Sequence, residues 1–501
     1  QVLPMPAIQT SDRDQTGRSL TETEQQLAAV WAEVLQRDAV GLHDNFFELG
    51  GDSILAMQII AKAHQVGLHL VPRQLFQYQT VAELAVVAEV QALSAVSQEP
   101  VTGTVPLLPI QRDFFTQAQP EPHHYNQAVM VIVDSEAQPE LLAQALQALV
   151  RHHDGLRSRF FCEAGIWQQV IQSPDAVTVS LDDLDLSHLP ADAQAAALAT
   201  AADDWQTSLH LSVGPLLRAV RVRLGERGDR LLLIAHHLIV DGVSWRILLA
   251  DLTTAYRQLA SGSEVQLPPK THSIQSWAQQ LVALAQSGYF EAERSYWRDM
   301  CAPTAAIPTD FAASADDNTV ASMAEISIGL DAAQTQALLT MATQIYHTQV
   351  NEVLLTVLGQ TLKPWTQSST VLIDLEGHGR DLDLQTLQDS SPLDVSRTVG
   401  WLTTVYPLRL ALPSGAMTEQ PRSVKEQLRA VPHQGVGYGV LRSLAAEPDP
   451  ALGSPAALSF NYSGQVRFNA APYPPGEIPA LASESVRSHS RPLSPRRRQL
   501  A

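Results

Sequence analysis

The sequence predicts a small α-helical bundle followed by a larger α/β region, and three observations support this division. Residues from about 20 to 91 place apolar side chains at helical spacing after two helix-start signals. From about residue 107 onward, strand-like apolar runs alternate with amphipathic helical stretches, and no short-period repeat is detectable. Between these parts, residues 93–106 hold two prolines and few large apolar side chains, which predicts a flexible interdomain linker.

Composition and charge restrict the possible functions. The chain has 501 residues, of which 45% are hydrophobic and 17% are charged, as is typical of globular proteins. A net charge of −19 argues against nucleic acid or an anionic membrane surface as the partner. Because the sequence holds neither a long apolar run nor a signal-peptide core, we predict a cytoplasmic location. Cys162 and Cys301 are the only cysteines, so we expect both to be buried thiols without a disulfide or metal role.

Two capping boxes mark helices of the bundle. Thr21 and Thr80 are each followed three residues later by a glutamate. Between these signals two glycines precede Ser53, after which apolar residues recur at every fourth position. A helix is therefore expected to begin near Ser53, and the local pattern alone is satisfied by an N-cap serine. Residues 1–19 show no periodicity and are predicted to be linker.

The α/β region opens with a predicted strand at residues 125–133 and a predicted helix at residues 140–150. This helix ends at the pair His152-His153, where cations suit the helix macrodipole, so we predict a structural role for the pair. Alternating residues at 220–224 and an apolar run at 231–234 flank a glycine-containing turn. This pattern predicts a β-hairpin.

The hairpin brings another histidine pair, His236-His237, to the end of its second strand. An amphipathic helix follows, with Trp245, Leu248 and Leu252 on one face. A strand end followed by a turn presents polar side chains to a cleft rather than to the core. His237 is therefore a candidate site residue.

Residues 46–54, FFELGGDSI, resemble the attachment motif of peptidyl and acyl carrier proteins. The resemblance implies a carrier bundle over residues 20–92, with 4'-phosphopantetheine bound covalently to Ser53 and a phosphopantetheinyl transferase as a partner. A helix N-terminus favours the phosphodiester of this cofactor. The negative charge of Asp52 is unfavourable beside that phosphodiester, so the presence of an acidic residue before the serine needs another explanation. In carriers that precede epimerization domains of nonribosomal peptide synthetases, the residue before the serine is typically Asp.

Residues 236–242, HHLIVDG, fit the HHxxxDG pattern shared by condensation and epimerization domains of these synthetases and by chloramphenicol acetyltransferase-like enzymes. Residues 376–380, EGHGR, resemble a motif of epimerization domains that condensation domains lack. Further strings resemble epimerization motifs in the same order, at residues 241–246, 394–407, 435–439 and 460–465. The chain is thus identified as a carrier followed by an epimerization domain.

This resemblance implies a two-lobed α/β domain like chloramphenicol acetyltransferase, with a first lobe at residues 107–275 and a second lobe at residues 276–469. The implied reaction is epimerization, from L to D, at the α-carbon of an aminoacyl or peptidyl thioester held on the carrier. His237 from the first lobe and Glu376 from the second are the expected catalytic pair. Either they exchange base and acid roles, or one acts alone while the other orients or stabilises.

Five further residues are expected to support the site. Asp241 is expected to shape the histidine loop through hydrogen bonds and an arginine partner. Asn461 and Tyr462 resemble positions near the thioester, where Asn461 is either an amide donor to the enolate oxygen or a turn residue. Arg397 and Tyr438 belong to the family motifs and are weaker candidates, because an arginine at a strand edge and a tyrosine between glycines are often purely structural. The sequence predicts no metal site.

The tail departs from the family pattern. Residues 470–501 are rich in Pro, Ser, Ala and Arg and show no strand or helix period, so we predict a disordered or truncated segment. Such a tail would leave the second lobe incomplete.

Two other functions stay open at this point. A condensation domain uses the same histidine motif to form a peptide bond, and an inert module would only hold the carrier-bound chain. The family context implies an upstream adenylation domain and a downstream condensation domain in the same assembly line. The sequence does not specify which amino acid is epimerized.

Overall fold

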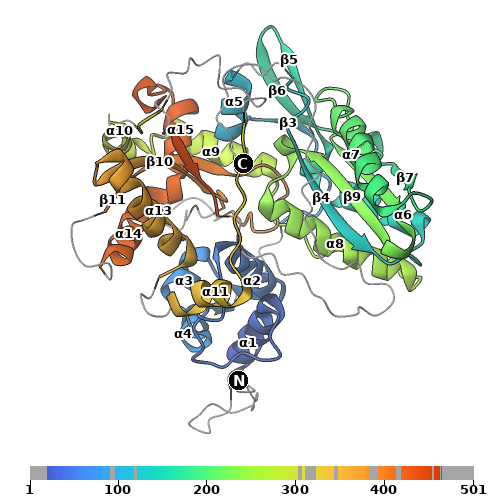
Figure 1. The fold of residues 1–501 in the computed structure, drawn as a ribbon, viewed down its shortest axis with the longest axis horizontal. Coiled ribbons are helices and arrows are strands. Elements are labelled where there is room, and N and C mark those ends of the chain that lie inside the picture. Colours follow the sequence, from blue (N-terminus) through green and yellow to red (C-terminus); the bar gives the residue numbers. More distant parts are fainter. Residues whose placement is uncertain are drawn as a thin grey trace.

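The computed structural model describes residues 20–90, 96–117, 121–302, 307–310, 323–342, 348–380, 382, 393–412, 419–453, 456–462 and 464. The predicted linker at residues 1–19 and the predicted tail at residues 470–501 lie outside the described residues. Figure 1 shows the carrier bundle, in blue, beneath two α/β lobes that lie side by side. The predicted order of a helical bundle and a two-lobed α/β domain is confirmed. Over the described ranges, no helix is both long and apolar enough to cross a bilayer.

The carrier bundle has four helices and one short sheet. The helices are α1 (Glu22–Leu35), α2 (Ser53–Gln65), α3 (Pro72–Gln77) and α4 (Val81–Val87), and β1 (Leu68–His69) pairs with β2 (Glu89–Val90). Both predicted caps are present, since the hydroxyls of Thr21 and Thr80 accept from backbone N–H groups three residues later. Trp31, Phe46 and Leu84 are fully buried between the helices. The apolar periodicity of the sequence therefore forms one compact core.

The start of α2 differs from the prediction of an N-cap serine. Ser53 is the first residue of the helix, and the Oδ1 atom of Asp52 accepts from the backbone N–H of Leu55 at 2.9 Å. Asp52 is therefore the capping residue, because its carboxylate satisfies an otherwise orphan amide. The preceding turn is tightly packed, since a Cβ atom on Gly51 would lie 2.4 Å from the ring of Phe46.

The first lobe is built on a four-stranded sheet. Its strand order is β4 (Asn126–Val133), β9 (Asp229–His236), β8 (Leu217–Arg223) and β7 (Leu181–Asp185). Three long helices flank it: α6 (Pro139–His152), α7 (Ala191–Thr207) and α8 (Gly242–Ala260). Leu231 and Leu233 of β9 join the main core, whereas Leu232 and Ile234 join a separate core with Ala202 of α7. Strand β9 is therefore buried on both faces, as its continuous apolar run predicts.

A second sheet extends the first lobe. It contains β3 (Gly103–Val105), β6 (Ile166–Ile171) and β5 (Ser158–Glu163) in that order. The outer end of the β5–β6 hairpin projects beyond the core, so Cys162 is exposed there. The expectation that both cysteines are buried is wrong for Cys162 and correct for Cys301 at the end of α10 (Arg294–Cys301).

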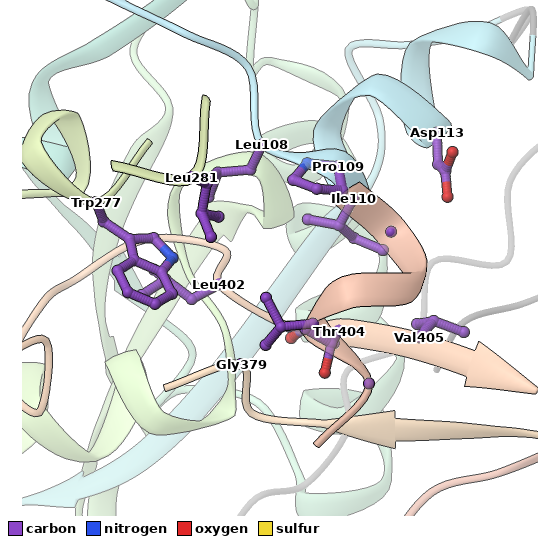
Figure 2. Close-up of a pocket in the computed structure, with 14 residues that line it drawn as sticks. Leu108, Pro109, Ile110, Asp113, Trp277, Leu281, Gly379, Leu402, Thr404 and Val405 are labelled. Atoms are coloured by element: carbon purple, nitrogen blue, oxygen red, sulfur yellow. The ribbon is translucent and has the colours of Figure 1, made fainter. Parts of the chain in front are cut away.

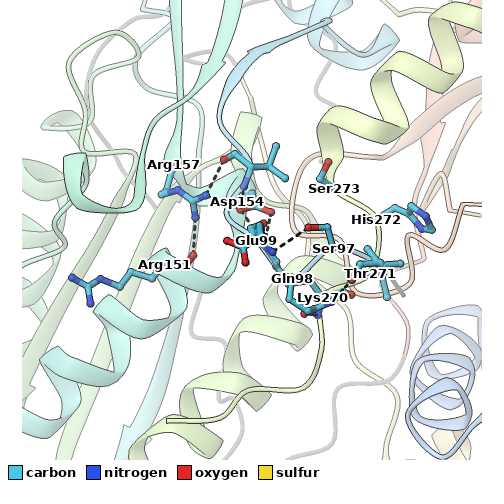
Figure 3. A network of polar contacts seen from close by, with 12 residues as sticks. Ser97, Gln98, Glu99, Arg151, Asp154, Arg157, Lys270, Thr271, His272 and Ser273 are labelled. Carbon is cyan, nitrogen blue, oxygen red and sulfur yellow. Dashed lines mark hydrogen bonds and ion pairs between the residues drawn. The ribbon is translucent and has the colours of Figure 1, made fainter. Parts of the chain in front are cut away.

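The segment expected to be a flexible linker is fixed to the two-lobed domain from residue 96 onward. Strand β3 pairs with β6, and the backbone N–H of Val101 donates to Asp154 at 3.0 Å. Arg157 donates to the carbonyl of Val101, and Lys270 donates to the carbonyl of Glu99 at 2.7 Å. Figure 3 shows this polar network around Asp154. Composition does not reveal it, because the donors are supplied by residues distant in the sequence.

The second lobe surrounds a three-stranded sheet in the order β11 (Thr404–Ala411), β10 (Thr370–Gly377) and β12 (Leu458–Phe460). Helices α9 (Ile274–Gln286), α13 (Val350–Thr366), α14 (Gln420–Arg429) and α15 (Val436–Ser443) belong to this lobe, and α11 (Ala332–Gln336) precedes α13 in the chain. Strand β12 runs parallel to β10, with Phe460 opposite Leu375. This register brings the residue after β12 close to Glu376.

Candidate functional site

His237 lies directly after β9, in a short 3₁₀ turn at His237–Ile239. Its backbone N–H donates to the carbonyl of Tyr125 at 2.8 Å, and its side chain is buried. The imidazole lies near two aromatic rings, at centroid distances of 5.3 Å to Tyr125 and 4.4 Å to Trp401. Because Trp401 comes from the second lobe, the imidazole lies where the two lobes meet.

Hydrogen bonds define the protonation of His237. Its Nδ1 atom lies 2.9 Å from the carbonyl oxygen of Val240, which can only accept, so Nδ1 carries a hydrogen. Its Nε2 atom lies 2.8 Å from the amide nitrogen of Gln127. The indole of Trp245 donates to the amide oxygen of Gln127 at 2.9 Å, which fixes the amide with its NH₂ group toward the histidine. These contacts favour the neutral imidazole with its lone pair on Nε2.

Sequence reasoning did not identify Gln127. Its position follows from the antiparallel pairing of β4 with β9, in which Gln127 is opposite Ala235. A strand that pairs with the one ending at His236 places the residues at its own start beside the histidine turn, and in β4 these are Asn126 and Gln127. Gln127 lies within the predicted strand at residues 125–133, but the sequence did not show which strand pairs with it.

His236 supports the turn and is not part of the reacting surface. It is fully buried, and its Nε2 atom lies 2.9 Å from the carbonyl of Pro122. Burial, despite the hydrogen bond to Pro122, lowers the pKa of His236 to about 3. Its Nδ1 atom accepts from the backbone N–H of Leu238 at 3.2 Å, so this imidazole is neutral and caps the turn.

Asp241 ties the histidine loop to the second lobe. It caps α8 by accepting from the backbone N–H and the hydroxyl of Ser244, both at 2.8 Å. It also accepts from the guanidinium of Arg380 at 2.8 and 3.1 Å and from the backbone N–H of Leu402 at 3.1 Å. Burial alone would raise the pKa of Asp241, but Arg380 and Ser244 outweigh it and hold this pKa below its usual value.

The EGHGR motif has a structural reason for its glycine and its arginine. Gly379 has a φ angle of +68°, and a Cβ atom there would lie 1.7 Å from the carbonyl oxygen of Leu402. Arg380 is buried and also donates to the carbonyls of His378 and Thr398. The motif therefore packs a tight turn against the loop at residues 393–403 of the same lobe.

Glu376 is the penultimate residue of β10 and is half-buried. The side-chain amide of Asn461 donates to its Oε2 atom at 2.8 Å. Burial raises the pKa of Glu376 to about 7, with a further contribution from the negative charge of Asp241. At neutral pH this carboxyl group is therefore populated in both protonation states, as a group that takes up and releases protons requires.

Tyr462 of the second lobe lies near the N-terminus of α2 in the carrier bundle. Burial, followed by the charge of Asp52, raises the pKa of Tyr462 to about 12. Burial lowers the pKa of Arg246 on α8, against the opposing effect of Asp52 and Tyr462. Asp52 thus acts electrostatically on one residue of each lobe. The N-terminus of α2, where Ser53 begins the helix, lies close to Arg246 and Tyr462.

Arg397 and Tyr438 have structural contacts of their own. Arg397 donates to both carboxylate oxygens of Asp251 at 2.7 Å, and Asp251 also pairs with His153 at 2.8 Å. The ligand atoms of His152, His153 and Asp251 lie within 4.8 Å of one another, and Arg397 supplies the positive charge at this cluster. Tyr438 is buried and donates to the carbonyl of Leu452 at 2.5 Å, within the second lobe.

A pocket lies between the lobes beside the EGHGR turn. Figure 2 shows Leu108, Pro109 and Ile110 from the first lobe facing Trp277, Leu402 and Thr404. Gly379 also lines this pocket, whereas His237 and Glu376 do not. The pocket therefore lies next to the polar site and is not identical with it.

Family comparison divides the chain in two. The family described as phosphopantetheine attachment site matches residues 25–86, and the family described as condensation domain matches residues 101–486. The chain is 43% identical over 477 residues to a linear gramicidin synthase of Brevibacillus parabrevis, which covers 93% of this chain and 9% of that protein. It is 44% identical over 474 residues to a chondramide synthase of Chondromyces crocatus, covering 93% of this chain and 12% of that protein. The chain thus spans roughly a tenth of the length of these relatives.

Solved structures agree with this division. The epimerization domain from the third module of tyrocidine synthetase B is 36% identical, with a TM-score of 0.66, over 74% of this chain and 83% of that one. The first condensation domain of the CDA synthetase is 21% identical, with a TM-score of 0.52, over 67% of this chain and 74% of that one. The second likeness shows the shared fold alone.

We expect Asp241→Asn to lower the free energy of unfolding by about 3–5 kcal/mol, because it leaves Arg380 buried without its anionic partner. Asp183→Asn is the matched control, since Asp183 pairs with Arg223 at 2.8 Å on the surface, where such pairs contribute less than about 1 kcal/mol. Urea unfolding of both variants measures the difference. Equal effects of the two substitutions would contradict the importance assigned to the buried pair.

Proposed function

Because the chain belongs to the condensation-domain family of nonribosomal peptide synthetases and carries a phosphopantetheine attachment domain, we propose that it epimerizes an aminoacyl or peptidyl thioester on its own carrier bundle. The covalently attached 4'-phosphopantetheine supplies the thioester, which acidifies the α-carbon of the bound group. Ser53 is the proposed attachment residue. Its place as the first residue of α2, after a turn packed on Phe46, suits a phosphodiester at a helix N-terminus.

One observation carries the proposal: Glu376, whose pKa is raised to about 7, lies on a strand of the second lobe, while a neutral His237 directly follows a strand of the first. Epimerization requires removal of the α-proton from one face and delivery of a proton to the other. A carboxyl group and an imidazole that together hold one proton are able to do both.

In one direction, neutral His237 takes the α-proton on Nε2 while protonated Glu376 gives its proton to the opposite face. The reverse direction starts from imidazolium and carboxylate and restores the first state. Between two turnovers in the forward direction, His237 releases its new proton to solvent and Glu376 takes one up from solvent. Gln127 covers Nε2 in the free chain, so its amide must turn aside when the substrate is in place. Asn461 orients Glu376 through its 2.8 Å hydrogen bond and is also the proposed amide donor to the enolate oxygen.

The supporting residues divide into two groups in this proposal. Asp241 and Arg397 align the lobes through ion pairs, and Tyr438 braces the second lobe. Tyr462 and Arg246 frame the N-terminus of α2, where they would meet the arm that carries the substrate.

The experiment loads the full chain from an L-aminoacyl-coenzyme A with a phosphopantetheinyl transferase and analyses the chirality of the released amino acid. A mixture of L and D isomers supports epimerization. An amide product formed with an added aminoacyl acceptor would instead support condensation, and retention of the L isomer without any product would support an inert module. Ser53→Ala is the control that takes no load.

Glu376→Gln removes the ionisable group with little change of shape. We expect formation of the D isomer from an L-aminoacyl group to fall by about 10²–10⁴-fold, because no acid is left to deliver a proton to the opposite face. Chiral analysis of the released amino acid measures the rate. Glu426→Gln, on the exposed face of α14, should retain the original rate. Normal epimerization in Glu376→Gln would remove this residue from the mechanism.

Gln127→Glu places a carboxylate beside Nε2 of His237. We expect the pKa of His237 to rise, because the carboxylate favours the imidazolium, and the pH optimum of epimerization to shift upward with it. Initial rates from pH 5 to 9 and the NMR titration of the imidazole measure both effects. Gln127→Asn, a shorter neutral amide, should slow the reaction without this shift. An unchanged pH profile in Gln127→Glu would contradict the role assigned to Gln127.

A further inference from the structure

The carrier bundle interacts with the two-lobed domain at both ends of α2. At the N-terminal end, the charge of Asp52 acts on Arg246 and Tyr462. At the C-terminal end, Nδ1 of His64 lies 2.7 Å from the Oδ2 atom of Asp394 in the second lobe. Because α2 has thirteen residues and is about 20 Å long, these two interactions set the direction of the α2 axis on the domain.

A third contact area flanks α2. A pocket between the bundle and the second lobe is lined by carrier residues and by residues of α13, α14 and the segment before α13. These are Asn45, Phe47, Glu48, Gln79, Thr348, Gln349, Glu352, Lys425 and Arg429.

The surroundings of His64 favour an imidazolium. Its Nε2 atom lies 2.8 Å from the carbonyl oxygen of Leu70, and its Nδ1 atom faces the carboxylate of Asp394. Both of these partners only accept, so an imidazolium donates to both of them. A neutral ring with its hydrogen on Nδ1 also donates to Asp394, and its Nε2 atom then accepts only the longer, 3.3 Å bond from the backbone N–H of Leu70. The last turn of α2 also favours a cation through the helix macrodipole.

The charges around His64 agree with this geometry. Burial lowers the pKa of His64, but the hydrogen bond and charge of Asp394 outweigh it and raise this pKa above its usual value. The ring of His69 stacks on that of His64 at 5.0 Å, and His272 lies against the backbone of Asp394. The side chains of His64 and Asp394 are 10% and 24% exposed, so solvent screens their attraction only in part.

Asp394 is held in place by its own domain. Its Oδ1 atom accepts from the backbone N–H of Ser396 at 2.8 Å. Its backbone N–H donates to Nδ1 of His272 at 2.9 Å, and its carbonyl accepts from the backbone N–H of His272 at 2.8 Å. Burial raises the pKa of Asp394, but its bonds to His64 and Ser396 outweigh it and lower this pKa. The carboxylate is therefore an ordered, charged acceptor for the carrier.

We propose that the His64–Asp394 pair is a docking contact that holds the carrier bundle on the two-lobed domain while His64 is protonated and releases it when the proton is lost. Neutral His64 donates to only one of its two acceptors, so Asp394 then loses either its hydrogen bond or the attraction of a full positive charge, and the contact weakens. The proposal goes beyond the proposed reaction, because it concerns where the carrier resides and not what happens to its cargo.

The pH range follows from the two shifts. Docking raises the pKa of His64, so the contact contributes fully below the undocked value of about 6.5 and is lost as the pH rises through the docked value. Docking lowers the pKa of Asp394, so the contact is also lost on acidification through the docked value of that carboxyl group. Docking should therefore be strongest in mildly acidic solution.

The test measures docking in the full chain by energy transfer between two dyes. One dye is attached to the exposed Cys162 on β5, and the other to a cysteine introduced by Val86→Cys on α4, where the native side chain is 84% exposed. Between pH 6 and 9 we expect the ratio of docked to undocked chains to fall, by about tenfold for each unit by which docking raises the His64 pKa.

His64→Gln and Asp394→Asn should each lower the docked fraction at pH 6 and remove most of its pH dependence. His43→Gln is the matched control, because His43 is exposed on the same bundle and should leave the pH curve unchanged. Circular dichroism and loading by a phosphopantetheinyl transferase establish that each variant is folded. If His64→Gln kept the original pH curve, the proposal would be overturned.

A second measurement keeps the proposal testable if the dyes perturb docking. The NMR titration of His64 in the unlabelled full chain should show its pKa fall when Asp394 is replaced by Asn. An unchanged titration would also overturn the proposal. Neither measurement involves turnover, so failure of the docking contact is distinguishable from failure of the proposed epimerization.

Discussion

The buried ion pair between Asp241 and Arg380 is the constraint on which the rest of the site depends. Removing two charges from water costs several kcal/mol per ion, and such a pair is retained only with good geometry and further hydrogen bonds. Asp241 meets this condition, because it accepts from Ser244, Arg380 and Leu402 together. Since Asp241 follows the histidine turn and Arg380 follows the strand of Glu376, the pair fixes the two proposed proton carriers relative to each other. The remaining negative charge of Asp241 also raises the pKa of Glu376.

The surroundings favour a single proton shared by the two groups. Burial makes an ionised Glu376 costly, so this carboxyl group retains a proton up to about pH 7. The amide of Gln127 makes an imidazolium costly, because a protonated Nε2 would face the NH₂ group of the amide. The resting site therefore favours neutral His237 beside protonated Glu376. If the site instead favoured a carboxylate and an imidazolium, the same residues would act, but Glu376 would be the base and His237 the acid in the first step.

Local signals in the sequence predicted most of the fold, and long-range pairing explains what they did not predict. Capping boxes and the apolar run of β9 are encoded within a few residues, so both were predicted correctly. Gln127 became visible only through the register of β4 against β9. The segment at residues 96–105 is sparse in apolar side chains, yet Arg157 and Lys270 hold its backbone from far along the chain. The sequence alone did not show whether Ser53 or Asp52 caps α2, because the two residues are adjacent. The observed start of the helix identifies Asp52 as the cap.

The loop at residues 393–403 bears both the docking partner of the carrier and an aromatic neighbour of His237. Asp394 lies at one end of this loop, and Trp401 packs on the imidazole at the other. Between them, Arg397 bonds to Asp251 and Gly400 bonds to the hydroxyl of Ser244, so the loop is anchored to the first lobe between its two ends. In the docking scheme proposed above, the protonation of His64 changes where the carrier resides, while these anchors keep Trp401 packed on the imidazole of His237.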